Sequence, residues 1–198
     1  LNGILYLNNA NIVSSGKCIY TGMGSLTIEL VDGTTNNVKS TYYYTGHAIY
    51  VFGDLHITGS GALTVQSSNK NSTSTSIGIW LVGGLSIDTT KKAVINIYGG
   101  VDGPDCTSTK VKEAVGIRAS SVSIKNAEVN VYGYHHAIQT YSGGTMKLTN
   151  SKGNAVSSTA TDCSALHSLD KSYPLKASVD KCKFTKESTN TYTWVRSK

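Results

Sequence analysis

Residues 47–65 read HAIYVFGDLHITGSGALTV, and the fold expected from the sequence follows from this phrase. Variants of the phrase occur at residues 77–97, IGIWLVGGLSIDTTKKAVINI, and at residues 115–131, VGIRASSVSIKNAEVNV. Each copy holds three short apolar segments separated by Gly, Ser, Asn or Thr. Strands this short cannot bury a face by themselves, so the repeat predicts coils of strands that stack on their neighbours.

The isoleucines that lead these phrases recur at intervals typical of a three-sided coil. Ile49, Ile79, Ile117 and Ile138 are separated by 30, 38 and 21 residues, and about 20 residues is the shortest period of such repeats. We therefore expect an all-β fold, a right-handed single-stranded parallel β-helix (a solenoid) with three short strands per coil. A β-sandwich is the alternative fold.

The composition agrees with one β-rich domain. The chain has 198 residues, 20 of them Gly and only 2 Pro, and 39% are hydrophobic, which suffices for a narrow core. Turn formers and β-branched residues dominate, so we expect little helix. We assign residues 1–198 to a single domain, with regular coils over about 1–160 and a last coil or C-terminal cap over 161–198.

The charges and the apolar runs exclude two classes of partner. The formal net charge is +6, but the basic residues are scattered and the only arginines are Arg118 and Arg196, which does not predict a nucleic-acid interface. No apolar run approaches the roughly 20 residues of a membrane span. The chain opens within the strand pattern at Leu1, so we interpret it as a mature or excised fragment.

The residue after each leading isoleucine indicates a candidate binding site. If the coils stack in register, these residues form one outward row with steps of about 4.8 Å. Aromatic faces cover the apolar faces of sugar rings, while Arg and Gln donate hydrogen bonds to hydroxyls or carboxylates. The predicted carbohydrate-binding residues are Tyr20, Tyr50, Trp80, Arg118 and Gln139.

Other interpretations of the aromatic residues stay open. The rings of the row could instead shield the sheet and one another without binding anything. Tyr98 and Tyr132 each end the third strand of a phrase, and they predict either a second stripe or ordinary packing between neighbouring coils.

The sequence offers one candidate metal site and one candidate disulfide. Asp102 and Asp105 lie in one loop, and paired carboxylates are the hard oxygen ligands that calcium takes, although acidic residues in turns also cap the turn. Of the four cysteines, Cys163 and Cys182 are the preferred disulfide pair, with buried free thiols as the alternative.

Three stretches carry a resemblance to a known family: residues 26–38, LTIELVDGTTNNV, residues 46–65, GHAIYVFGDLHITGSGALTV, and residues 84–87, GLSI, after Gly78-Ile79. Over about residues 3–160 the chain resembles the secreted carbohydrate-binding β-helix family first defined in a cellulolytic clostridium. The resemblance implies a polysaccharide-lyase-like fold, calcium binding and attachment to cellulose or pectin without catalysis.

The chain departs from this family at one kind of position. Family members often carry an acidic residue just before the phrase that begins with Gly-Ile or Ala-Ile. Here those positions hold His47, Ile77, Val115 and His136. The expectation of calcium as a cofactor therefore depends on Asp102 and Asp105 alone.

These observations together predict a non-catalytic, extracellular polysaccharide-binding module. The 12 acidic residues are spread along the chain, and Glu29, Glu113, Glu128 and Glu187 share no repeat position. Because glycoside hydrolysis needs two carboxylates at a fixed separation, we do not expect an enzyme. The expected location is secreted, at a bacterial cell surface or in a cellulosome-like assembly. The alternatives are a structural stalk or adhesin with a protein partner, and a pectate-lyase-like enzyme.

Overall fold

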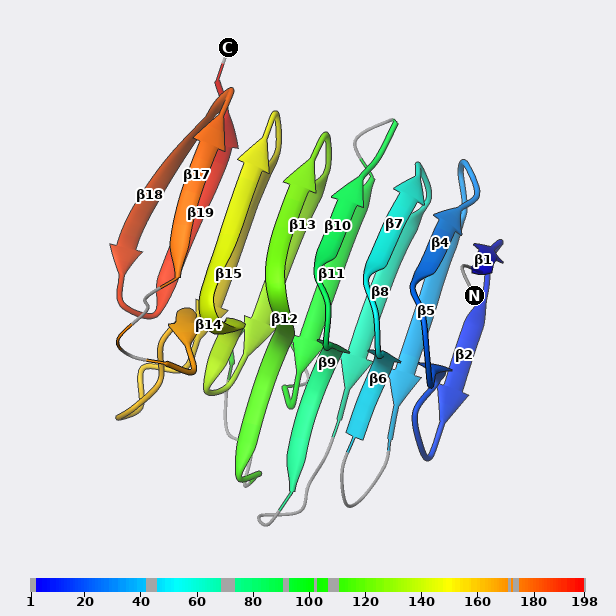
Figure 1. The fold of residues 1–198 in the computed structure, drawn as a ribbon, viewed down its shortest axis with the longest axis horizontal. Helices are drawn as coiled ribbons and strands as arrows, with labels where there is room; N and C mark the ends of the chain where they lie inside the picture. The colour runs from blue at the N-terminus through cyan, green and yellow to red at the C-terminus, as the bar shows by residue number, and fades with distance from the viewer. Residues whose placement is uncertain are drawn as a thin grey trace.

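The computed structural model describes residues 3–41, 46–68, 74–90, 93–101, 103–106, 111–170, 172 and 175–197. Within these residues every regular element is a strand, which confirms the all-β class. The strands form two sheets that run side by side along the long axis of the molecule (Figure 1). The N-terminus lies at one end of this axis and the C-terminus at the other.

The larger sheet has eleven strands, all parallel, and it curls into a half-barrel. Strand β12 joins two series of strands, β1-β4-β7-β10 and β9-β6-β3. Its residues 113–118 pair with β9, and its residues 122–125 pair with β10. The strands of this sheet are β1 (Gly3–Leu7), β3 (Ile19–Thr21), β4 (Leu26–Leu30), β6 (Gly46–Val51), β7 (Leu55–Gly59), β9 (Thr75–Leu81), β10 (Leu85–Asp88), β12 (Glu113–Lys125), β14 (His136–Thr149), β16 (Leu166–Ser168) and β17 (Lys176–Asp180).

The smaller sheet has eight strands and is mixed. Its strands pair in parallel up to β15, after which β19 pairs with both β15 and β18 in the antiparallel sense. The strands of this sheet are β2 (Asn11–Ser14), β5 (Thr35–Ser40), β8 (Ala62–Ser67), β11 (Val94–Gly99), β13 (Glu128–Gly133), β15 (Lys152–Ser157), β18 (Cys182–Ser188) and β19 (Thr191–Arg196).

The expected single-stranded parallel β-helix, with its three strands per coil, is wrong. The first two strands of each sequence phrase belong to one sheet rather than to two. Glycines such as Gly53 and Gly83 separate these strands in the earlier phrases, but β12 carries Ser120 and Ser121 at the corresponding corner. The strand therefore continues through that corner with only a shift of register between Ala119 and Ser121, and β18 and β19 add the antiparallel pairs.

The core lies between the two sheets and is built from rows of apolar side chains in register. Ile28, Ile57, Ile87, Ile124 and Leu148 occupy one such row on successive strands of the large sheet, and none of them is exposed. Burial of each side chain of this size stabilises the fold by about 1.5–3 kcal/mol. The alternation of apolar and polar residues thus places every second side chain on the outer face.

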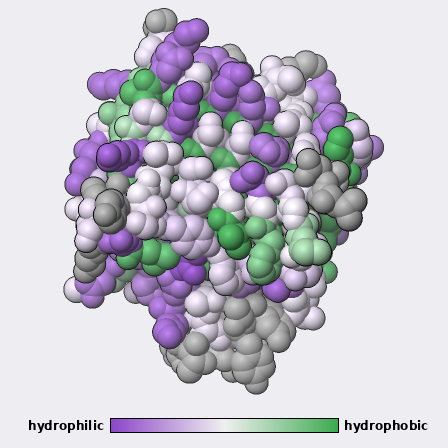
Figure 2. Space-filling view, in the orientation of Figure 1, coloured by the Kyte–Doolittle hydropathy of each residue, from purple (hydrophilic) through white to green (hydrophobic). Residues whose placement is uncertain are grey.

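The outer surface is mostly polar. On the face shown in Figure 2, hydrophobic residues form small separate patches among hydrophilic ones. In the part of the chain that the structure describes, no helix is long and apolar enough to cross a membrane.

Candidate functional site

The five residues predicted to form an outward row do lie on neighbouring strands in direct register. Tyr20 on β3 is paired with Tyr50 on β6, and Tyr50 with Trp80 on β9. Arg118 on β12 follows Trp80, and Gln139 on β14 follows Arg118. The structure therefore brings all five together, and their role in binding stays a prediction.

The aromatic half of the row presents rings that touch one another. Tyr20 and Tyr50 stack with ring centroids 5.5 Å apart and planes inclined by 17°, while Trp80 is tilted by 41° against Tyr50 at 4.8 Å. Because the stacked rings face each other along the row, their edges and hydroxyls point to solvent. The outer face of Tyr20 is covered by no further strand among the described residues, and Tyr20 is 54% exposed.

Two apolar side chains border the row, each two residues further along the chain and just after the end of β6 or β9. Phe52 lies 5.4 Å from Tyr50 in an edge-to-face contact, and Val82 occupies the same position after Trp80. Both side chains are about half exposed. We call Tyr20, Tyr50, Phe52, Trp80 and Val82 the aromatic face.

A lysine lies against the aromatic face. The Lys17 ammonium is 4.4 Å from the ring centroid of Tyr20 and 4.5 Å from that of Tyr50. Contacts of this kind at exposed positions contribute about 0.5–1 kcal/mol. A ligand can therefore displace Lys17 at small cost or use it as a hydrogen-bond donor.

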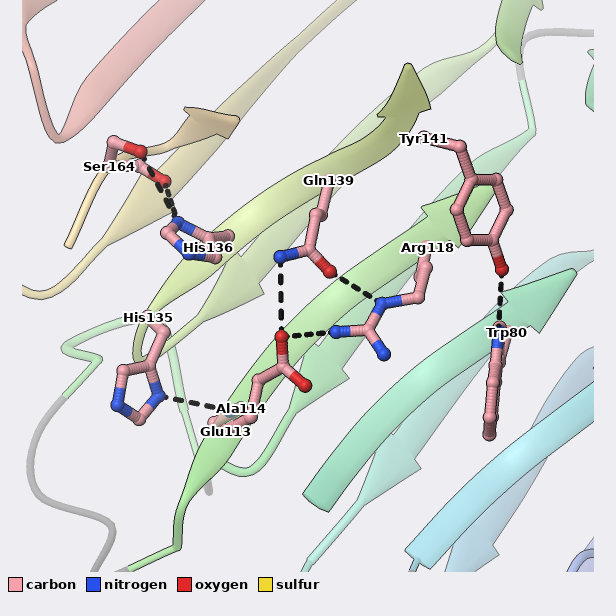
Figure 3. A network of polar contacts seen from close by, with 9 residues as sticks. All are labelled: Trp80, Glu113, Ala114, Arg118, His135, His136, Gln139, Tyr141 and Ser164. Atoms are coloured by element: carbon pink, nitrogen blue, oxygen red, sulfur yellow. Dashed lines mark hydrogen bonds and ion pairs between the residues drawn. The ribbon is translucent and has the colours of Figure 1, made fainter. Parts of the chain in front are cut away.

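The polar half of the row is buried and internally paired. Arg118 is 9% exposed and Gln139 is 1% exposed. The Arg118 guanidinium forms an ion pair with Glu113 and donates to the Gln139 carbonyl oxygen, and the Gln139 amide donates to Glu113 (Figure 3). The hydrogen-bond donors of Arg118 and Gln139, which were predicted to contact a glycan, thus bond within the cluster instead.

The ion pair also sets the protonation state of Glu113. Burial alone would raise the pKa of this carboxyl, but the hydrogen bond and the charge of Arg118, with the Gln139 amide, lower it below its ordinary value. Glu113 is therefore ionised at neutral pH and balances the Arg118 charge within the buried cluster.

Two buried histidines precede members of the row on their own strands, His47 before Tyr50 and His136 before Gln139, and both are neutral at pH 7. His47 contacts the edge of Trp80 at 4.6 Å, and its pKa is lowered to about 4 by burial and by the charges of Lys17 and Arg118, against a hydrogen bond to Gly46. His136 also has a pKa of about 4, through burial and the proximity of His167. The two charged groups that lower the pKa of His47, Lys17 and Arg118, are both positive.

His136 and His167 extend the polar half by one strand. Their rings stack at 4.0 Å, and His136 Nδ1 lies 3.0 Å from the Ser164 carbonyl oxygen. His167 on β16 pairs with Gln139 in register, so it is the sixth member of the outward row. The phrase Ala165-Leu166-His167 repeats the Ala-Ile-Gln pattern of β14, and this likeness could have revealed it from sequence.

Sequence reasoning also missed residues that border the row. Phe52 and Val82 follow from the two-residue periodicity of a strand and were recognisable. The sequence pattern did not indicate Lys17 or Glu113. Lys17 precedes Tyr20 and Glu113 precedes Arg118, so neither occupies the position after a leading isoleucine that defines the row.

Tyr98 and Tyr132 pack on the smaller sheet rather than forming an open stripe. Their rings stack at 5.0 Å with planes inclined by 9°, and Val101 and Cys106 pack against Tyr132. Val101 and Cys106 therefore cover part of this pair of rings.

The candidate metal site is only partly described. Asp102 lies outside the described residues, and Asp105 is exposed. No group of three or more His, Cys, Asp or Glu side chains suited to a metal ion occurs among the residues that the structure describes.

The preferred disulfide is not formed. Cys163 and Cys182 are both buried free thiols, as is Cys106, and Cys18 is half-buried and also free. The Cys182 thiol donates to the Ser151 carbonyl oxygen. The cysteines are therefore free thiols in this structure, which was the alternative to a disulfide.

Comparisons with protein-family models, with curated proteins and with solved structures found no match for this chain. The resemblance to the clostridial carbohydrate-binding family thus stays a prediction.

Proposed function

We propose that the chain is a non-catalytic polysaccharide-binding module, and that the aromatic face is its binding site. The observation that carries the proposal is the register of Tyr20, Tyr50 and Trp80, which aligns three rings on consecutive parallel strands. Parallel pairing spaces the strands by about 4.8 Å, and the ring centroids follow at 5.5 Å and 4.8 Å. An extended glycan is a linear ligand with a short repeat, which suits such a row.

The chemistry of the face suits sugar rings. Phe52 presents an exposed apolar ring beside the phenol side chains of Tyr20 and Tyr50, and sugars offer both C–H faces and hydroxyls. The sheet beneath fixes the backbone of each residue, so little conformational freedom is lost on binding. Lys17 supplies a further donor at the end of the row.

The buried polar half has a supporting role in this proposal. Arg118, Gln139 and Glu113 hold one another in place and fix the strand beside Trp80. A glycan that extends beyond Trp80 meets Tyr141 and then the covered edge of this network. Recognition therefore centres on the aromatic side chains, at an extracellular location.

The test compares exposed tyrosines inside and outside the face. Tyr20 is 54% exposed and Tyr6, on β1, is 60% exposed. The parent, Tyr20→Ala, Trp80→Ala and Tyr6→Ala proteins are assayed on a glycan array and on insoluble cellulose, each with and without a calcium chelator. We expect Tyr20→Ala and Trp80→Ala to weaken binding about tenfold or more, a loss of about 1.4 kcal/mol, and Tyr6→Ala to bind as the parent does.

Two results would reject the proposal. Equal binding by the parent and the Trp80→Ala protein would remove the aromatic face as the site. Failure of the parent to bind any glycan on the array would favour the structural stalk or adhesin alternative. A loss of binding on chelation would show that calcium participates.

A further inference from the structure

The C-terminal end of the molecule has an open groove between the two sheets. Its volume is about 430 Å³. Residues of β16 and β17 line one side and residues of β18 and β19 the other. Most of the lining is apolar, and it consists of Leu166, His167, Ser168, Leu175, Ala177, Phe184 and Tyr192.

The groove is a stretch of the core that nothing covers among the described residues. Val179 on β17 is paired with Leu148 in the row of buried residues that runs through the large sheet. Leu148 is 0% exposed, whereas Val179 is 46% exposed. Ala177, two residues earlier on the same side of the strand, is exposed as well. An apolar side chain on a further strand beside β17 would continue the row and cover Val179.

The backbone at this end is open too. In the described part of the chain, β16 and β17 pair only with β14, and all five residues of β17 are exposed. The amide and carbonyl groups on the outer edge of β17 therefore have no neighbouring strand. An unpaired edge of this kind is a template for one more strand.

The charge around the groove selects the partner. Lys176 lies on β17, Lys183 and Lys186 lie on β18, and Lys181 lies between these two strands, against two acids, Asp180 and Glu187, in the same stretch. The Lys186 ammonium lies 5.8 Å from the ring of Tyr192, which lines the groove. Two copies of this end repel each other, because like charges would meet, whereas an acidic segment is attracted.

We propose that the groove binds an extended acidic segment of another protein, which adds to β17 as a further strand. Alternate apolar side chains of that segment enter the groove beside Ala177, Val179 and Phe184. Its acidic side chains, on the opposite side of the strand, lie beside Lys176, and the lysines of β18 add to the attraction across the groove. Backbone hydrogen bonds supply affinity, and the apolar contacts set the register.

The probe is a fluorescent peptide of about ten residues that alternates valine and glutamate, since side chains of a strand alternate between two faces. A second peptide of the same composition groups its valines in one block and its glutamates in another. We expect the alternating peptide to bind, with an affinity that falls as salt rises, and the block peptide to bind at least tenfold more weakly. Equal binding of the two peptides would overturn strand addition.

Two matched, uncharged variants compare the two sides of β17. Val179→Asn places an amide in the apolar row beside the groove, and Ser178→Asn places the same amide on the opposite side of the strand, at a residue that is also exposed. We expect a loss of at least tenfold for Val179→Asn and less than threefold for Ser178→Asn, with both proteins unfolding at the parent temperature. Equal losses would show that the peptide makes no specific apolar contact on this side of β17 and would contradict the proposal.

Amide hydrogen exchange provides the direct test of the added strand. Exchange of residues 176–180 should slow when the alternating peptide is present, and Tyr20→Ala should bind the peptide as the parent does, because the aromatic face is a separate site. Unchanged exchange would overturn the proposal. So would concentration-dependent oligomers, detected by sedimentation, without peptide binding, since a second copy would then be the occupant.

Discussion

Tyr141 on β14 reaches across β12 and bonds to Trp80 on β9 (Figure 3). The Trp80 Nε1–H donates to the Tyr141 hydroxyl at 2.8 Å, and that hydroxyl donates to the Leu81 carbonyl oxygen at 2.9 Å. Ser120, a small residue, follows Ala119 on β12 as Tyr141 follows Thr140 on β14, and Ala119 and Thr140 are paired in register. The bond holds the indole of Trp80 in place, at the position where the aromatic face meets the polar half and the Arg118 guanidinium lies 5.8 Å from the Trp80 ring centroid.

Removing the Tyr141 hydroxyl should loosen Trp80. In Tyr141→Phe the Trp80 Nε1–H and the Leu81 carbonyl both lose their partner, and we expect a loss of about 1–2 kcal/mol in the free energy of unfolding. In a Trp194→Phe background, the remaining Trp80 emission should shift to longer wavelength. Tyr6→Phe, at an exposed position, should change stability by less than about 0.5 kcal/mol. An unchanged Trp80 spectrum would contradict the role given to Tyr141.

Neutralising Glu113 should destabilise the fold through Arg118. Glu113→Gln leaves the buried guanidinium without a counter-charge, which costs about 3–5 kcal/mol for a fully buried pair, and about 2 kcal/mol is expected here because Glu113 is one-quarter exposed. Urea unfolding measures the difference. Asp88→Asn removes the exposed Lys125–Asp88 pair and should cost less than about 1 kcal/mol.

A double variant distinguishes an uncompensated charge from lost packing. Glu113→Gln combined with Arg118→Met removes both charges, so it should be more stable than Glu113→Gln alone. If the double variant instead shows the sum of two independent losses, the two side chains do not act as a pair.

Stability should fall as the pH drops from about 6.5 to about 4. The pKa values of His47 and His136 are about 4 in the folded protein, against an ordinary value of 6.5. Within this window the unfolded chain binds protons on these rings and the folded protein does not, so unfolding becomes easier. The loss is about 3 kcal/mol for each ring when the shift is fully expressed.

Variants assign this pH dependence to the two rings. His47→Gln and His136→Gln should each flatten the plot of unfolding free energy against pH between 7 and 4.5. His56→Gln, at an exposed position, should retain the parent slope. A parent slope in both buried-histidine variants would show that other groups govern the loss.

Gly99 should tolerate no side chain. A Cβ atom at this position would lie 1.7 Å from the Val115 carbonyl oxygen, which belongs to the backbone of β12 and cannot give way. We expect Gly99→Ala to lose more than about 3 kcal/mol or to fail to fold. Gly3→Ala is the control, because nothing lies within 4 Å of its Cβ. Thermal unfolding measures both, and similar midpoints would contradict the close approach.

The register of the outward row could be predicted from sequence because each phrase carries its own marker. A small residue followed by Ile fixes which side chain points outward, and Tyr50 and Trp80 therefore pair as expected. The arrangement of the sheets could not be predicted in the same way. At each corner the chain either ends a strand or continues it through a bend. Which of the two occurs depends on a few residues such as Ser120 and Ser121, and serine has no conformational preference that distinguishes them.

The burial of the polar half was also beyond the sequence. Arg118 and Gln139 occupy outward positions, and outward positions are usually exposed on a sheet. Glu113 pairs with both of them, and this contact depends on three-dimensional proximity rather than on any spacing in the chain. The reversal at β18 and β19 likewise follows from how the last residues pair, not from the repeat.

The equal spacing of the aromatic residues bears on how such a surface can evolve. Thirty residues separate Tyr20 from Tyr50, and thirty separate Tyr50 from Trp80, yet the strand register would be the same if the connecting loops were longer or shorter. A tandem duplication of one such segment would add one ring to the row without altering the others. The extent of the surface can therefore change in whole steps through gene duplication, while single substitutions adjust the chemistry of each step.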